Sequence, residues 1–258
     1  MSDPAQPVIQ LENVGLQYRL AKQRIPSFKE YAVHWMRGTL VHEEFWGLRD
    51  VSFSVRPGES VGVIGHNGAG KSTLLKVISR VLAPSTGRMV VRGAVMPLLE
   101  LGTGFDPELT GVENIYLNAL LFGRTRAEVE RVVPSIVETS GLGDFIHAPI
   151  RQYSSGMWAR LGFAVATAWV PDILILDEVL AVGDANFQKR CEERMRRFRD
   201  EGSTILLVSH DPGSITATCD RCLWLDKGRL RADGPARDVL QEYRDQAVRP
   251  AETPLTSA

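Results

Sequence analysis

The chain has 258 residues, enough for one large domain with a sizeable hydrophobic core. Its 30 basic residues nearly balance 31 acidic ones, and the formal net charge of −1 argues against nucleic acid as a partner. No apolar stretch is long enough to span a bilayer and the N-terminus lacks the apolar core of a signal peptide, so we expect a cytoplasmic protein, soluble or peripheral to a membrane.

Three strands are predicted in the N-terminal part of the chain. Apolar residues from Val8 to Tyr18 indicate the first strand, and the alternation from Val51 to Val55 indicates the second. The Pro57-Gly58 turn then leads into a short apolar run, Val61 to Ile64, which is typical of a buried strand.

A segment of about residues 19–47 separates the first two strands and predicts a short amphipathic helix. Ser27 followed by Glu30 forms a capping box, and Gly38 follows the last helical turn. One largely aromatic face is formed at helical spacing by Phe28, Tyr31, Ala32, Trp35 and Met36. Such a face packs either on the protein's own domain or on a membrane or partner, and the sequence favours neither.

The run from Gly65 to Thr73 matches the phosphate-binding P-loop pattern G-x-x-x-x-G-K-[ST]. It follows an apolar strand and precedes a helical pattern, an order that lets glycine backbone N–H groups and a helix N-terminus bind phosphate oxygens together. Lys71 would reach the terminal phosphates and Ser72 would bind Mg²⁺. We therefore expect a nucleoside triphosphate to be bound by Gly65, His66, Asn67, Gly68, Ala69, Gly70, Lys71, Ser72 and Thr73.

Short apolar strands alternate with helical segments in the rest of the chain. The runs Ile173 to Leu176 and Ile205 to Val208 end in polar residues, so we predict an α/β fold whose parallel sheet is covered on both faces. Amphipathic helices predominate between about residues 101 and 170 and predict a helical lobe. A short helix to about residue 246 then precedes a polar tail, residues 247–258, that we expect to be mobile.

Candidate residues for triphosphate hydrolysis lie at the carboxyl ends of these strands, where parallel sheets bind their ligands. Asp177 would hold Mg²⁺, and the adjacent Glu178 would polarise the attacking water. His210 would contact the terminal phosphate. With the P-loop lysine, the predicted catalytic set is Lys71, Glu178 and His210.

Cys219 and Cys222 form a C-x-x-C pattern, but the sequence has only three cysteines. A zinc site needs four ligands, and the second half of such a site is missing. We therefore interpret these two cysteines and Cys191 as small, semi-buried side chains rather than metal or redox groups.

The segment Tyr153-Ser154-Ser155-Gly156-Met157 resembles the signature sequence of ABC ATPases, usually Leu-Ser-Gly-Gly-Gln. It departs at three of five positions but keeps the hydroxyl of Ser154 and the bare backbone of Gly156. Those two features suit a helix N-terminus that faces phosphate. Residues 181–184, Ala-Val-Gly-Asp, likewise resemble the D-loop of that family.

With the P-loop, the Asp177-Glu178 pair and His210, five motifs occur in family order. The resemblance implies one ABC nucleotide-binding domain over residues 1–246, with a P-loop ATPase core and parallel sheet, an N-terminal antiparallel β portion and a helical lobe. It also implies a homodimer, in which the P-loop of one subunit and the signature of the other enclose each ATP, and Asp184 communicates across the interface. The signature residues acting on the partner's ATP would be Ser154, Ser155, Gly156 and Met157.

An aromatic residue of the first strand stacks on adenine in this family, and Tyr18 stands at the matching place. The segment that follows lengthens the separation of Tyr18 from the P-loop, so Phe45 or Trp46 are alternatives for the same role. Ordinary strand packing is a further role for Tyr18.

Several departures from the common family pattern resemble the ATPase subunits of bacterial polysaccharide exporters. Glu100 stands where most relatives carry the glutamine of the Q-loop, and residues 100–111, the signature and residues 178–184 all resemble that group. By this resemblance Glu100 joins Ser72 and Asp177 as a ligand of Mg²⁺, although a solvated loop carboxylate would fit the same sequence. The helix predicted between residues 19 and 47 would then lie near the membrane.

The resemblance implies a peripheral subunit at the cytoplasmic face of the bacterial inner membrane, which uses ATP and Mg²⁺. It would work with two copies of a transmembrane permease to move a lipid-linked glycan such as O-antigen, capsule, galactan or teichoic acid. An ABC ATPase for small molecules or drugs is the rival within the family, but it predicts glutamine at position 100 and no insert after Tyr18. A non-transport, ATP-switched protein is the rival outside it. We expect no C-terminal carbohydrate-binding domain.

Overall fold

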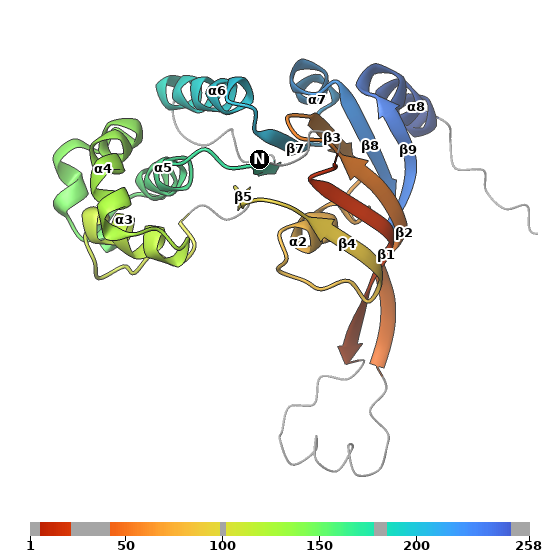
Figure 1. Cartoon of the computed structure of the whole chain (residues 1–258), viewed down its shortest axis with the longest axis horizontal. Coiled ribbons are helices and arrows are strands. Elements are labelled where there is room, and N and C mark those ends of the chain that lie inside the picture. Colours follow the sequence, from red (N-terminus) through yellow and green to blue (C-terminus); the bar gives the residue numbers. More distant parts are fainter. Residues whose placement is uncertain (1–5, 22–41, 99–101, 178–184, 249–258) are drawn as a thin grey trace, which may run out of the picture.

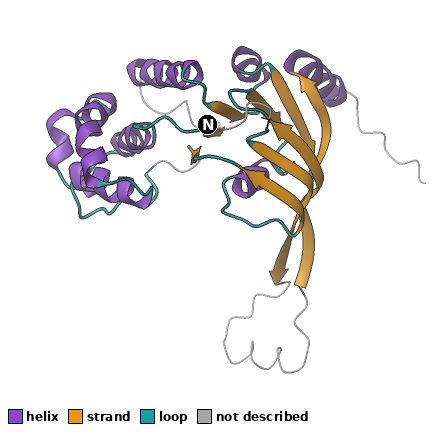
Figure 2. Cartoon of the chain, viewed as in Figure 1, coloured by secondary structure: helices purple, strands orange, loops and turns teal. Residues whose placement is uncertain are grey.

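The structure is a computed structural model that describes residues 6–21, 42–98, 102–177 and 185–248 (Figure 1). Two β-sheets and several groups of helices make up this part of the chain (Figure 2). The helix predicted around residues 27–38, the side chains of Glu100, Glu178 and Asp184, and the tail from residue 249 lie outside the described residues.

The smaller sheet is antiparallel and has β1 (Ile9–Ala21) at its centre, between β2 (His42–Val55) and β4 (Thr86–Val91). β1 and β2 are both longer than the sequence predicts, since their pairing continues to Ala21 opposite His42. The apolar pattern ends at Tyr18, but backbone pairing needs no apolar side chain. A cross-strand ion pair between Arg19 and Glu44, 2.9 Å long, accompanies the extension.

The larger sheet has the strand order β5-β6-β7-β3-β8-β9. Its first five strands are parallel and β9 is antiparallel to β8. Residues of β3 and β7 are buried along their whole length, as their continuous apolar sequences predict. The strands are β3 (Ser60–Ile64), β5 (Val95–Pro97), β6 (Ile173–Asp177), β7 (Thr204–Val208), β8 (Arg221–Asp226) and β9 (Arg229–Pro235).

Alternate residues of the larger sheet enter two different cores. Ile173 and Ile175 face a core shared with the antiparallel sheet and with α2 (Lys71–Ile78). Leu174 and Leu176 face a second core, which is covered by α6 (Ala185–Asp200), α7 (Pro212–Thr218) and α8 (Ala236–Val248) (Figure 1). Burial on both faces explains why these strands are apolar throughout, and the predicted α/β class is confirmed.

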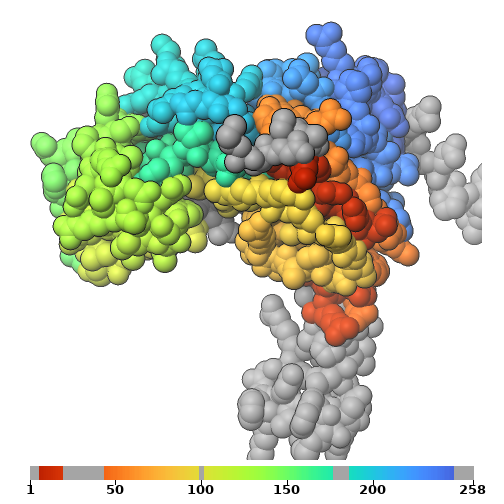
Figure 3. All heavy atoms as spheres, in the orientation of Figure 1, coloured from red at the N-terminus to blue at the C-terminus, as the bar shows by residue number. Residues whose placement is uncertain are grey.

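The helical lobe has a core of its own, which includes Ile115, Ile136 and Leu161. It forms a separate mass beside the sheets (Figure 3). Thr110 and Thr125 each cap a helix through a complete capping box with the glutamate three residues later. The lobe consists of α3 (Gly111–Leu121), α4 (Arg126–Ser140), the 3₁₀ turns η1 (Gly143–His147) and η2 (Ile150–Gln152), and α5 (Ser155–Ala166). Among the described residues, none of the helices is both long and apolar enough to cross a membrane.

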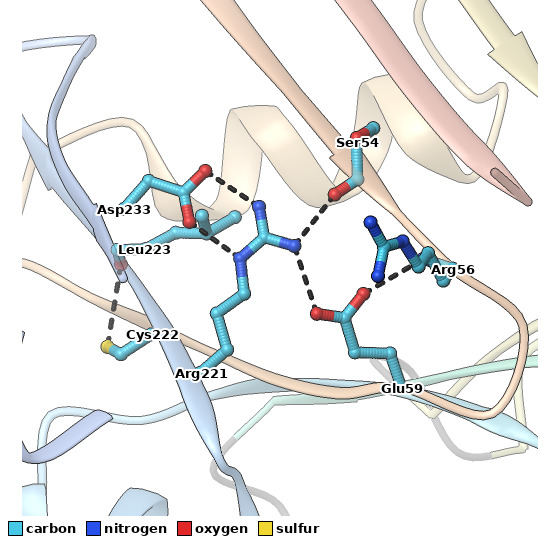
Figure 4. Close-up of polar contacts among 7 residues, drawn as sticks. All are labelled: Ser54, Arg56, Glu59, Arg221, Cys222, Leu223 and Asp233. Atoms are coloured by element: carbon cyan, nitrogen blue, oxygen red, sulfur yellow. Dashed lines mark hydrogen bonds and ion pairs between the residues drawn. The ribbon is translucent and has the colours of Figure 1, made fainter. Parts of the chain in front are cut away.

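Arg221 on β8 joins the two sheets (Figure 4). Its guanidinium donates to both carboxylate oxygens of Asp233 at 2.6 and 2.7 Å, to Glu59 at 3.0 Å and to the carbonyl of Ser54 on β2 at 2.9 Å. The hydrogen bonds that Arg221 donates to Asp233, followed by the one to Glu59, raise the pKa of Arg221. This network fixes β8 relative to β2, and both strands reach the site described below.

The three cysteines are buried thiols rather than semi-buried ones. Cys191 lies in α6, Cys219 ends α7 and Cys222 lies in β8. Burial raises the pKa of each thiol to about 12, so each is neutral at pH 7. Their position agrees with the packing role that the sequence favours.

Candidate nucleotide-binding site

A loop joins the buried strand β3 to α2 and lines a cavity of about 300 Å³. The walls of the cavity are residues 67–73 and three residues of β2, Phe45, Trp46 and Gly47. α2 begins after Gly70, which has φ 104° and supplies no side-chain cap. The first backbone N–H groups of α2 therefore have no side-chain acceptor, and such a helix start is a ready site for an anion.

Gly70 is fixed by both its backbone conformation and its packing. A Cβ atom at this position would lie 2.7 Å from the carbonyl oxygen of Gly47 and 3.3 Å from the Cα of Gly228. Gly68 has a positive φ of 80° as well, but a Cβ there would meet open space. The loop thus tolerates a side chain at Gly68 better than at Gly70.

Seven of the nine P-loop residues named from the sequence, residues 67–73, line this cavity. Lys71 Nζ donates to the carbonyl oxygens of Gly65 at 2.6 Å and His66 at 3.2 Å, so its charge lies against the first half of the loop. Ser72 is exposed and lines the cavity. His66 does not line it and instead contacts Asp226 at the end of β8, 2.9 Å away.

Three aromatic side chains lie beside the loop. Tyr18 stacks on Phe45, with ring centroids 5.0 Å apart and an angle of 20° between the planes. Its hydroxyl is 3.3 Å from Thr73 Oγ1, and its ring covers Gly47 so closely that a Cβ there would be 2.6 Å away. Phe45 and Trp46 line the cavity and are 45% and 37% exposed, whereas Tyr18 is not among the lining residues. Of the three, Phe45 and Trp46 are therefore the better placed to meet a base.

The sheet brings Asp177 and His210 to the same edge as the P-loop. In the register of the parallel strands Asp177 lies opposite Val208, and Val208 lies opposite Val63, two residues before Gly65. His210 follows β7 after the buried Ser209 and is exposed. The next residue, Asp211, caps α7, and hydrogen bonds from Ser214 and then Gly213 lower its pKa.

The residue types at this edge suit Mg²⁺. Ser72 lines the cavity and Asp177 is the last residue of β6, and hydroxyl and carboxylate oxygens are the ligands that this ion prefers. Leu98 donates its backbone N–H to Ile175 of β6 at 2.8 Å, so the segment leading to Glu100 also starts beside this strand.

The signature residues lie in the lobe, at the start of α5 (Figure 1). Ser154 is the N-cap, and its Oγ accepts a hydrogen bond of 3.2 Å from the backbone N–H of Met157. Ser154 and Ser155 are exposed, and a Cβ at Gly156 would meet only Ser154 Oγ, 3.9 Å away. None of the four signature residues lines the P-loop cavity of the same chain.

Sequence reasoning missed the residues that support the loop from outside. Gly228 donates its backbone N–H to Ala69 at 2.9 Å, and its carbonyl accepts from Arg49 at 2.7 Å. Asp226 and Gly228 belong to the hairpin turn between β8 and β9. The Asp-Lys-Gly sequence predicts a turn, but only the sheet order, with β8 beside β3, places that turn against the P-loop.

Comparison with known proteins identifies the family. A family model described as ABC transporter matches residues 48–181, which include the P-loop and the signature. The O-antigen export system ATP-binding protein RfbB of Klebsiella pneumoniae is 46% identical over 241 residues, covering 93% of this chain and 98% of that protein. The teichoic acids export ATP-binding protein TagH of Listeria monocytogenes is 39% identical over 91% of this chain and 69% of its own length.

A solved structure has the same fold. The ATP-binding subunit of an ABC transporter superposes with a TM-score of 0.72 at 25% identity, covering 92% of this chain and 93% of that structure. The predicted antiparallel β portion, parallel sheet and helical lobe are thus confirmed as parts of one known architecture.

Proposed function

Because this chain belongs to the ABC transporter family of ATP-binding proteins, we propose that it is the ATP-hydrolysing subunit of an exporter of lipid-linked polysaccharide. The substrate class in this proposal rests on the 46% identity to an O-antigen export protein over 93% of the chain. The similarity to a teichoic acid export protein supports a polysaccharide rather than a small molecule or drug. As in such export systems, the subunit would act at the cytoplasmic face of the inner membrane beside two copies of a permease.

The chain's own residues account for the ATPase steps. The open N–H groups at the start of α2 and the ammonium of Lys71 bind the terminal phosphates. Mg²⁺, held by Ser72 and Asp177 with Glu100, would supply positive charge to the phosphoryl oxygens. Glu178 polarises the attacking water, and His210 contacts the terminal phosphate from the next strand.

A homodimer completes the site. Within the described part of the chain, the P-loop cavity is lined by residues 45–47 and 67–73 and by none of the signature residues. The exposed start of α5 lies apart from it, with Ser154, Ser155 and Gly156 available to a second copy. Each ATP would be enclosed by the P-loop of one copy and the signature of the other, and Asp184 would link the two sites.

An apolar groove between the lobe and the sheet core suits the transmembrane partner. A cavity of about 290 Å³ is lined by residues of α2, α3 and α5 and by the segment after β5. Val81, Leu121 and Phe122 beside it are 66%, 66% and 45% exposed, which is unusual for large apolar side chains outside an interface. Because the groove touches both the core and the lobe, a partner bound there would sense their movement.

The groove can be tested by charge substitution. Leu121→Glu is expected to abolish co-purification with the permease from detergent extracts and to leave ATP binding unchanged, because Leu121 does not line the P-loop cavity. Phe145→Glu is the matched control, since Phe145 is 63% exposed on another part of the same lobe. Equal retention of the permease by both variants would exclude this groove as the docking surface.

The exporter function is tested in the producing bacterium. Lys71→Ala should remove the surface glycan and cause its lipid-linked precursor to accumulate inside the cell, because the transport step stops while synthesis continues. Glu178→Gln should bind ATP and fail to hydrolyse it. Unchanged surface glycans in the Lys71→Ala strain would refute the export function, and normal hydrolysis by Glu178→Gln would refute the role of Glu178.

A further inference from the structure

Both ring nitrogens of His66 face hydrogen-bond acceptors. Nδ1 lies 2.7 Å from the carbonyl oxygen of Asn67, and Nε2 lies 2.9 Å from Oδ1 of Asp226. A carbonyl oxygen and a carboxylate oxygen can only accept. Each contact is therefore a hydrogen bond in which the ring nitrogen donates.

Asp226 is held in place by a tight hairpin. Lys227 and Gly228 form the two-residue turn between β8 and β9, with φ of 46° and 76°, as in a type I′ turn. The turn is hydrogen-bonded to the P-loop through Gly228 N–H and the carbonyl of Ala69, at 2.9 Å. The carboxylate of Asp226 is only 20% exposed, so it is a fixed acceptor for His66.

The contact to Asn67 orients the loop. A trans peptide is planar, so its C=O and the next N–H point in opposite directions. When the carbonyl of Asn67 is bonded to the His66 ring, the N–H of Gly68 is turned away from that ring. Asn67 and Gly68 line the cavity whereas His66 does not, so His66 acts on the loop from outside.

We propose that His66, held between Asn67 and Asp226, is a positioning residue that orders the first half of the P-loop for ATP. The inference rests on the proposed ATPase function and adds to it a residue that acts on nucleotide affinity from outside the cavity. A side chain that cannot reach both acceptors leaves the carbonyl of Asn67 without its link to the β8–β9 turn. The N–H of Gly68 is then no longer held in one direction, and ATP binding weakens.

Other charged groups surround this pair. Asp226 faces the ring from β8, and Lys71 of α2 binds the carbonyl of His66. Lys227 follows Asp226 in the turn, and His210 follows the neighbouring strand β7. Because Lys71 and His210 are themselves predicted to contact the phosphates, the contribution of His66 must be measured as a difference between variants.

The test is equilibrium binding of Mg-ATP to the full chain, by displacement of a fluorescent nucleotide. His66→Ala removes both contacts, and His66→Arg keeps a donor side chain that can reach both acceptors. His147→Ala is the matched control, since His147 is exposed in the lobe. From the modest net value of a partly exposed hydrogen bond to a carboxylate, we expect His66→Ala to bind Mg-ATP about three- to tenfold more weakly than the wild type.

The control His147→Ala should bind like the wild type, and His66→Arg should recover part of the affinity that His66→Ala loses. Asp226→Asn, which preserves the shape of the acceptor but not its charge, should weaken binding less than His66→Ala. Wild-type affinity in His66→Ala would overturn this inference while leaving ATP binding intact. Failure of the wild type to bind ATP would instead overturn the proposed function, and this inference with it.

Discussion

The chain presents two helix N-termini suited to phosphate, at α2 and α5, and they are built differently. α2 starts after Gly70 and has no side-chain cap, whereas α5 starts after Ser154, whose hydroxyl already accepts the N–H of Met157. The loop before α2 is supported from outside by the β8–β9 turn. The residues before α5 lie at the exposed surface of the lobe.

This difference separates binding from catalysis. The open and supported start of α2 can hold the terminal phosphates within one chain, since its N–H groups need an outside acceptor. At the start of α5, the N–H of Met157 already has an acceptor in Ser154 without nucleotide. This helix start can therefore be presented to the ATP of a second copy. Changes at α2 should therefore abolish binding, and changes at α5 should abolish hydrolysis only.

Gly70→Ala should have the largest effect. Its Cβ would meet the backbone oxygen of Gly47 at 2.7 Å in a conformation with φ 104°, so the loop must move and ATP binding should be lost. Gly68→Ala is the control, because it has the same type of φ but open space around the added carbon. It should cost only about 1–2 kcal/mol of stability and retain measurable binding in calorimetry. Similar binding by both variants would contradict the packing argument.

Ser154→Ala should reduce ATP hydrolysis by about a hundredfold, as expected for a lost donor to a reacting phosphoryl group, with little change in ATP affinity of the isolated chain. It should also lower the free energy of unfolding by about 1 kcal/mol through the missing N-cap. Thr110→Ala removes a comparable cap from α3 in the same lobe. If Thr110→Ala slowed hydrolysis as much as Ser154→Ala, lobe stability rather than the signature hydroxyl would explain the loss.

Trp46→Ala should weaken ATP binding about tenfold, within the range of stacking one base on an aromatic side chain. Tyr18→Phe should change binding by less than about twofold, because it removes only the long contact to Thr73 and keeps the stack on Phe45. Titration of both variants with ATP and with inorganic triphosphate separates base from phosphate binding. If Tyr18→Phe weakened ATP binding more than Trp46→Ala did, Tyr18 rather than Trp46 would be the residue that contacts the base.

Asp211→Asn should have the smallest effect and concerns a third helix start at this edge, that of α7. The pKa of Asp211 is lowered from 3.8 in the fold, so its contribution to stability is present above that value and is lost as the pH falls through the lower one. Asparagine also caps helices but does not titrate. The wild type should therefore unfold at a higher temperature than Asp211→Asn at pH 7, and the two unfolding temperatures should approach each other below about pH 4. A difference that is constant with pH would show that the carboxylate charge is not involved.

Sequence patterns predicted the parallel strands and the P-loop well, because these features are local. A strand buried on both faces must be apolar throughout, as Ile205 to Val208 are, and the P-loop needs glycine at fixed positions. The sequence predicts β1 and β2 to be shorter than they are. Their pairing around Arg19 and Glu44 depends on a partner strand, which apolar alternation does not reveal. Glu100, Glu178 and Asp184 remain predictions.

The sequence by itself determined that this chain binds a triphosphate and belongs among ABC ATPases, because each motif is a short run whose chemistry is contained in its own residues. Only the tertiary structure decided what surrounds that loop. It placed Gly47 and Gly228 against Gly70, and Asp226 against His66. It also placed Trp46 at the wall of the cavity, whereas Tyr18 does not line the cavity. These neighbours are 20 to 160 residues distant in the chain, and the order of the strands together with the packing of the two sheets brings them to the loop.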